Sequence, residues 1–143
     1  LAIRSGDNGA KSYNYEIRHF LHSSMHVSSD CSLRSNIDYA SVSDLVRECY
    51  RNQARECLSS GEKVCLALNR SLQGIINSGL KIGPERPNKG FMMNISFEQK
   101  TGESSSFLEL KDGKCDKDYT AGEYLIPEDR SKGLIVVRLT LCK

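Results

Sequence analysis

The sequence predicts an α+β fold: a two-layer, disulfide-stapled sandwich in which two helices pack on one face of a mainly antiparallel sheet of four or five strands. Three observations predict it. Apolar residues recur with a helical period between residues 44 and 77, and form strand-like runs after residue 90. The strand-like runs follow one another across short turns, which is typical of antiparallel hairpins. Six cysteines are spread along the chain, which predicts disulfides between the layers.

Length and composition predict a single domain over residues 13–143, preceded by a flexible, polar segment over residues 1–12. A chain of 143 residues can bury roughly 70% of its unfolded surface, so it has room for a hydrophobic core. Apolar residues make up 38% of the chain, an ordinary globular share that excludes a disordered chain. The net charge of +2 gives no strong attraction to nucleic acid or to an anionic membrane, and no apolar run is long enough to span one.

The first element is predicted over residues 13–21. Every second residue from Tyr13 to Leu21 is aromatic, aliphatic or histidine, and this period of two indicates a strand. A helix over residues 14–27 is the competing prediction. Residues 28–42 are rich in serine, which predicts a loop pinned at its cysteine.

Two helices are predicted next. The first starts at Asp44, after a capping serine at Ser41 or Ser43, and ends near Gly61. The second covers residues 62–77, where the apolar side chains form a single stripe. A short strand followed by a shorter helix is the alternative for this second segment.

The rest of the chain predicts strands. Residues 80–90 hold two prolines and two glycines, so they predict a loop. Strands are predicted over residues 91–100 and 104–111, and a short one over residues 123–126. Residues 133–142 form the most hydrophobic segment, which predicts a central strand.

The six cysteines predict three disulfides. None lies in a Cys-x-x-Cys pair, which disfavours the common zinc and redox motifs. Cys49 and Cys57 would lie about 12 Å apart on one predicted helix, too far for a disulfide. The layered fold favours bridges from helix to strand, with Cys115 and Cys142 bonded to cysteines of the first half. The complete set is Cys31, Cys49, Cys57, Cys65, Cys115 and Cys142.

Three features predict a secreted, extracellular protein. An even set of dispersed cysteines is typical of oxidising compartments. The triplets at residues 69–71 and 94–96 match the N-glycosylation sequon, so Asn69 and Asn94 are the predicted sites of a glycoprotein. The chain begins with Leu1 rather than methionine, which predicts a processed N-terminus.

All three histidines, His19, His22 and His26, lie within eight residues. On a helix their spacing would put them on one face, where three imidazoles, joined by Glu16, would suit zinc or copper. On the predicted strand His19 and His22 point to opposite sides. The strand prediction therefore implies ordinary surface histidines, with no metal and no cofactor.

A ribonuclease-like hydrolase is the enzymatic alternative. Phosphodiester transfer needs an acid, a base and a cation within reach of one phosphate. Groups of these kinds come from Tyr13, Glu16, Arg18 and His19, with a distant acid such as Glu98 or Glu109. The chain contains no Gly-x-Ser-x-Gly motif and no phosphate-cradling glycine loop, so its sequence favours a protein without catalysis.

Two groups of basic side chains are predicted to bind a partner. Arg47, Arg51 and Arg55 form a stripe on the polar face of the first predicted helix, flanked by acidic residues. Such a stripe fits an acidic partner or a lipid head group, and a solvated helix face is the simpler interpretation. The second group lies in the loop over residues 80–90 and consists of Lys81, Arg86 and Lys89.

The stretch from Ser71 to Phe97 (SLQGIINSGLKIGPERPNKGFMMNISF) resembles part of the small cysteine-rich killer toxins of fungi and their viruses. Cys142, after a final strand, also fits that family. The resemblance implies a two-layer α/β sandwich, as in many secreted fungal effectors, and a protein aimed at another organism. The toxins have cysteines just after the helix, where this chain has Leu80 and Ile82, so no functional residue is carried over.

The sequence therefore predicts a secreted, monomeric virulence protein of the effector or toxin type. It would act by binding a protein or cell-surface target of a host or competitor. A secreted protease inhibitor is a further hypothesis, with the loop over residues 80–90 or 127–133 as the inserted element.

Overall fold

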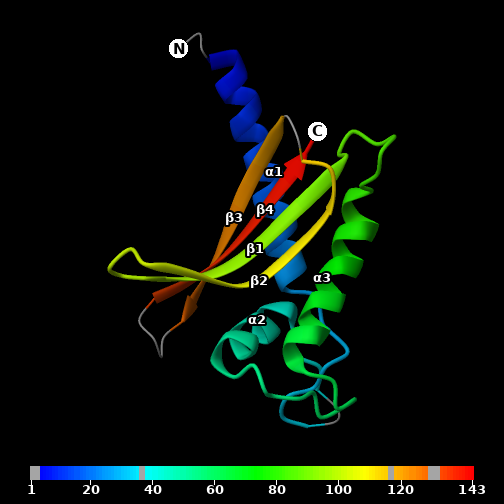
Figure 1. Cartoon of the computed structure of the whole chain (residues 1–143), viewed down its shortest axis with the longest axis vertical. Helices are drawn as coiled ribbons and strands as arrows, with labels where there is room; N and C mark the ends of the chain where they lie inside the picture. Colours follow the sequence, from blue (N-terminus) through cyan, green and yellow to red (C-terminus); the bar gives the residue numbers. More distant parts are fainter. Residues whose placement is uncertain (1–3, 36–37, 116–117, 129–132) are drawn as a thin grey trace.

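The computed structural model describes residues 4–35, 38–115, 118–128 and 133–143, including side chains from residue 15 onward. It contains three helices and a four-stranded sheet (Figure 1). The helices are α1 (Arg4–Met25), α2 (Val42–Arg51) and α3 (Val64–Leu80). The strands are β1 (Gly90–Gln99), β2 (Ser104–Gly113), β3 (Tyr119–Glu128) and β4 (Gly133–Cys142).

The sheet has the strand order β2-β1-β4-β3, and each neighbouring pair is antiparallel. The predicted antiparallel sheet and the central position of the last strand are therefore confirmed. Alternate residues of β1, from Phe91 to Phe97, are buried in the core that the helices complete. The other face lies open, because Met92 and Leu125 on it are 43% and 47% exposed. One layer of helices on one layer of sheet is the predicted α+β sandwich.

Residues 13–21 are helical, so the predicted strand there is wrong, and the described residues form a sheet of four strands. Ile17, Leu21 and Met25 are spaced by four, and all are at most 3% exposed against the sheet, where α1 packs along β3. Tyr15, which shares the alternating pattern, is 63% exposed. The buried side chains follow the period of a helix, so the competing prediction of a helix over residues 14–27 is confirmed. Helix α1 begins earlier than predicted, at Arg4.

Helix α2 is shorter than predicted. It begins with a capping box, in which Ser41 Oγ accepts from the Asp44 backbone N–H and the Asp44 carboxylate accepts from the Ser41 N–H. It ends at Arg51, because Asn52 turns into extended backbone at φ −153°. The predicted extension to Gly61 is therefore wrong, and residues 52–63 form a loop closed by a bridge between Glu56 and Lys63. The helix predicted over residues 62–77 is confirmed as α3, and its strand alternative is not observed.

The disulfides join neighbouring segments rather than layers. They are Cys31–Cys57, Cys49–Cys65 and Cys115–Cys142. The expected bridges from helix to strand are wrong, because Cys115, just after β2, bonds to Cys142 at the end of β4. The exclusion of a Cys49–Cys57 bond is confirmed, although Cys57 lies beyond the helix. No described helix is both long and apolar enough to cross a membrane.

Candidate functional site

An open hollow of about 510 Å³ lies between α2 and the loop over residues 33–40. We call it the arginine hollow, because four arginines line it: Arg34, Arg47, Arg51 and Arg55. The remaining lining includes Asp38, Asp44, Glu48 and Tyr39. The predicted stripe of arginines therefore converges on one concave surface.

Three segments of the chain present these arginines. Arg47 and Arg51 are four residues apart on α2, so the helix places them on the same side. Arg55 comes from the loop after the helix, not from the helix itself as predicted. Arg34 comes from the segment before α2 and also lines the hollow.

The arginine hollow is not a bare basic surface, because carboxylates neutralise its predicted arginines. Arg51 donates two hydrogen bonds, of 2.9 and 2.8 Å, to Glu128, whose side chain is fully buried. Arg55 lies 3.2 Å from Glu48. Arg47 makes only a long contact of 3.5 Å with Asp44, and its side chain is 33% exposed. Arg47 is thus the member of the stripe best placed to exchange its carboxylate for one on a partner.

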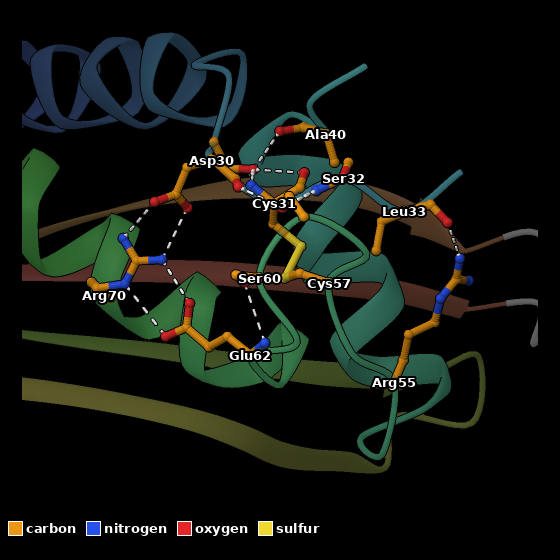
Figure 2. The surroundings of a disulfide bond; sticks show 12 residues. Asp30, Cys31, Ser32, Leu33, Ala40, Arg55, Cys57, Ser60, Glu62 and Arg70 are labelled. Atoms are coloured by element: carbon orange, nitrogen blue, oxygen red, sulfur yellow. Dashed lines mark hydrogen bonds and ion pairs between the residues drawn. A yellow bond between two sulfur atoms is a disulfide. The ribbon is translucent and has the colours of Figure 1, made fainter. Parts of the chain in front are cut away.

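A disulfide and several hydrogen bonds hold the loop wall of the hollow in place (Figure 2). Cys31 is bonded to Cys57, and Arg55 donates to the backbone oxygen of Leu33. Ala40 N–H donates to the Cys31 carbonyl at 2.8 Å. The disulfide and these hydrogen bonds therefore fix the described parts of the loop, on either side of residues 36–37, against the loop that carries Arg55.

Tyr39 is the exposed aromatic of this wall, with 53% of its surface accessible. Tyrosine and arginine are the residue types that most often carry binding energy at protein interfaces. The sequence did not single out Tyr39 or Arg34, because both lie in an irregular serine-rich loop with no periodic pattern. Together with Arg47, they give the hollow the chemistry to bind an acidic segment of a partner.

The structure pairs two of the histidines and places the third beside a tyrosine. His22 and His26 lie with ring centroids 4.6 Å apart, whereas His19 pairs with Tyr15 at 5.5 Å. The Nδ1 atom of His26 lies 2.8 Å from the backbone oxygen of His22, so a local contact occupies it. Within the described part of the chain, no three His, Cys, Asp or Glu side chains are placed to hold a metal ion.

The residues considered for ribonuclease chemistry lie along α1. Glu16, Arg18 and His19 are exposed on that helix, while the side chain of Tyr13 is outside the described residues. Among the described residues, the hollows beside α2, on the sheet and at the loop after α3 are lined by none of Glu16, Arg18 and His19, although Glu109 lines two of them.

The two sequons lie in regular structure. Asn69 is half-buried in α3, whereas Asn94 lies on β1 and its Nδ2 donates to Ser106 Oγ at 2.9 Å. In the loop over residues 81–90, Lys89 lines a separate hollow near the end of the sheet. Part of the proposed inhibitory loop, residues 129–132, lies outside the described residues.

The guanidinium group of Arg70 connects α3 to the segment next to Cys31 through hydrogen bonds (Figure 2). The sequence did not predict this interaction. Arg70 donates to both oxygens of Asp30 at 3.0 and 2.9 Å, and to Glu62 at 2.7 Å. These hydrogen bonds raise the pKa of Arg70, and they lower the pKa of Asp30. Because 40 residues separate Asp30 from Arg70, no local pattern reveals the pair.

No family model, no curated protein and no solved structure matches this chain. The resemblance of residues 71–97 to killer toxins therefore stays a prediction.

Proposed function

We propose that this chain is a secreted, disulfide-stabilised protein of the effector or toxin type that acts by binding a macromolecule of a host or competitor, without catalysis of its own. The observation that carries the proposal is the arginine hollow, a concave surface with arginine and tyrosine at its rim. Hollows of this kind bind through a few buried anchors, and the surrounding contacts exclude water.

The cysteines support the extracellular part of the proposal. All six are in disulfides, and none is free. Disulfides persist in oxidising surroundings and are rare in the cytosol. Cys31–Cys57 joins the segment before Leu33 to the loop that carries Arg55, and both of these residues line the hollow, whereas Cys49–Cys65 joins α2 to α3.

The chemistry of the hollow favours a partner with an acidic side chain. Arg34, which lines the hollow, is exposed. The guanidinium group of Arg47 lies 3.5 Å from the Asp44 carboxylate, which is a long contact for an ion pair. A carboxylate on the partner, placed between the two guanidinium groups, would receive charge-assisted hydrogen bonds that the long contact with Asp44 does not supply. Tyr39 would contribute apolar area beside it.

The proposal is tested by quantitative binding of the labelled protein to intact cells and to extracellular fluid of candidate target organisms. We expect the double variant Tyr39→Ala/Arg47→Ala to bind at least about tenfold more weakly than the natural chain, since both substitutions remove rim anchors. Tyr15→Ala/Arg18→Ala is the matched control, because it removes the same two side-chain types from an exposed part of α1.

Equal loss in both variants, or no loss in either, would overturn the arginine hollow as the binding site. The alternatives make their own predictions on the same material. A ribonuclease would cleave RNA in a manner that His19→Ala abolishes, and a protease inhibitor would slow a purified protease at stoichiometric concentration. Either result would replace the proposed function.

A further inference from the structure

A second hollow, of about 650 Å³, lies at the opposite end of the molecule from α2, where the loop after α3 meets the end of β2 and the end of β4 (Figure 1). Its volume falls in the range of about 300–1,000 Å³ that is usual for small-molecule sites. We call it the lysine hollow and define it by Ile82, Pro84, Lys89, Asp112, Lys114 and Lys143.

Charge is concentrated at this end. Residues 81–90, 111–114 and 143 contain six basic and two acidic side chains, a formal charge of +4, whereas the whole chain carries +2. Of the ionisable residues that line the hollow itself, three are lysines and one is an aspartate. An anion is therefore the charge that complements this surface.

The wall of the hollow is apolar. Ile82 packs against the hydrophobic core. Pro84 contributes an apolar ring to the lining and has no backbone N–H to donate a hydrogen bond. Gly83 and Gly113 contribute backbone without side chains. Gly113 has φ +76°, and a Cβ there would overlap the Lys89 carbonyl, so the close approach of the two segments requires glycine. An apolar body of a ligand has a surface to contact beneath the ammonium groups.

Covalent and backbone bonds fix the segments around the hollow. Cys115 is bonded to Cys142, and the Lys89 N–H donates to the Cys142 carbonyl at 2.7 Å. The Gly83 N–H donates to the Asn88 carbonyl at 3.1 Å, and Lys89 Nζ donates to the Arg86 carbonyl at 2.6 Å. The Lys89 ammonium is thus held at the rim, and the site does not need to be ordered by its ligand.

We propose that the lysine hollow binds an amphiphilic anion, in which a phosphate or carboxylate meets the ammonium groups and a short apolar chain lies against Ile82 and Pro84. Such a molecule exists free in solution or as the head and first carbons of a membrane lipid. The inference does not depend on the arginine hollow, which lies at the other end of the chain's long axis (Figure 1).

The test titrates the full chain, labelled with nitrogen-15, with octyl phosphate below its micelle concentration, and follows the backbone amide signals. We expect saturable shifts at Gly83, Gly113 and Lys114. Inorganic phosphate should bind at least about tenfold more weakly, because it lacks the apolar chain, and octyl glucoside should not bind, because it lacks the anion. Binding of the protein to vesicles of phosphatidylglycerol and phosphatidylcholine tests the membrane lipid as the source of the anion. A protein that binds these vesicles but does not bind octyl phosphate would overturn a small-molecule site.

Two variants locate the site. Lys114→Gln/Lys143→Gln should weaken octyl phosphate binding by about tenfold, whereas Arg18→Gln/Lys100→Gln, with the same loss of charge elsewhere, should not. Gly83→Leu should fill the hollow without harming the fold, because a Cβ at Gly83 meets only the Arg86 Cγ, at 3.5 Å. Octyl phosphate binding that survives both Gly83→Leu and the double lysine variant, or that falls equally in the charge-matched control, would overturn the proposal.

Discussion

Arg51, in the last turn of α2, donates two hydrogen bonds of 2.9 and 2.8 Å to the carboxylate of Glu128 at the end of β3. The Glu128 side chain is fully buried, whereas the Arg51 side chain is 28% exposed. This fork joins the helical layer to the sheet. Arg51 is therefore a structural member of the arginine hollow, and Arg47 and Tyr39 remain for the partner.

Removing the arginine alone should be costly. Arg51→Ala removes two charge-assisted hydrogen bonds from the buried Glu128 carboxylate, and we expect the free energy of unfolding to fall by about 3 kcal/mol in urea denaturation. The matched control is Arg47→Ala, whose exposed contact of 3.5 Å with Asp44 should contribute less than about 0.5 kcal/mol. Equal effects of the two substitutions would contradict a structural role for the Arg51–Glu128 pair.

Replacing both Arg51 and Glu128 tests whether this ion pair contributes to stability alone or also to binding at the arginine hollow. Arg51→Met/Glu128→Leu removes both charges and fills similar volume, so it should recover most of the stability that Arg51→Ala loses. Because neither residue is assigned to the partner, the double variant should keep the binding of the natural chain in the assay with target cells. A folded double variant without binding would show that Arg51 itself contacts the partner.

The strands were predictable because their burial is visible in the sequence. In β1, Phe91, Met93, Ile95 and Phe97 are buried at alternate positions, and in the central strand β4 seven of ten residues are buried, most of them apolar. Helix α1 was not predictable to the same degree. Two periods coexist between residues 13 and 25, and only contact with β3 shows that Leu21 and Met25 are buried while Tyr15 is exposed.

The candidate site was predictable only where it is local. The helical phase of α2 places Arg47 and Arg51 together, and this follows from their spacing alone. The ion-pair partners of these arginines could not be predicted where they are distant in the sequence, because Glu128 is 77 residues from Arg51. The expected bonds from Cys115 and Cys142 to the first half of the chain were wrong, because Gly90 of β1 pairs with both Gly113 and Cys142 and so brings the ends of β2 and β4 together, where Cys115 bonds to Cys142.

The packing of α1 can be tested by a pair of truncations. Leu21→Ala removes a fully buried side chain facing the sheet and should lower the free energy of unfolding by about 3 kcal/mol. Tyr15→Ala, on the exposed side of the same helix, should change it by less than about 0.5 kcal/mol. Thermal unfolding followed by circular dichroism measures both. Similar losses would indicate that residues 13–21 bury alternate side chains, as the strand prediction required.

The Cys31–Cys57 disulfide should govern both stability and the shape of the arginine hollow. It closes a segment of 26 residues, and loss of a cross-link of that length costs about 3 kcal/mol. We expect Cys31→Ala/Cys57→Ala to show that loss, together with faster hydrogen exchange at residue 40, whose N–H donates to the Cys31 carbonyl. Unchanged exchange at Ala40 would mean that hydrogen bonds alone hold the loop wall.

The Asp30–Arg70 fork should give stability a dependence on acid pH. Hydrogen bonds from Arg70 lower the pKa of Asp30 below its ordinary value of 3.8. The folded state therefore binds this proton less readily than the unfolded state, so the contribution of the pair is present above about pH 4 and is lost as the pH falls through the lowered pKa. The pair is exposed, so the effect is small.

Arg70→Gln removes the donor and returns the pKa of Asp30 toward its ordinary range. The natural chain should then have a higher urea midpoint than Arg70→Gln near pH 6, and the difference should shrink toward about pH 2.5. Asp30→Asn should lower the midpoint near pH 6 in the same direction, because it removes the same ion pair from the other side. A difference between the natural chain and Arg70→Gln that stays constant over this range would show that Arg70 stabilises the loop through packing, and not through its ion pairs with carboxylates.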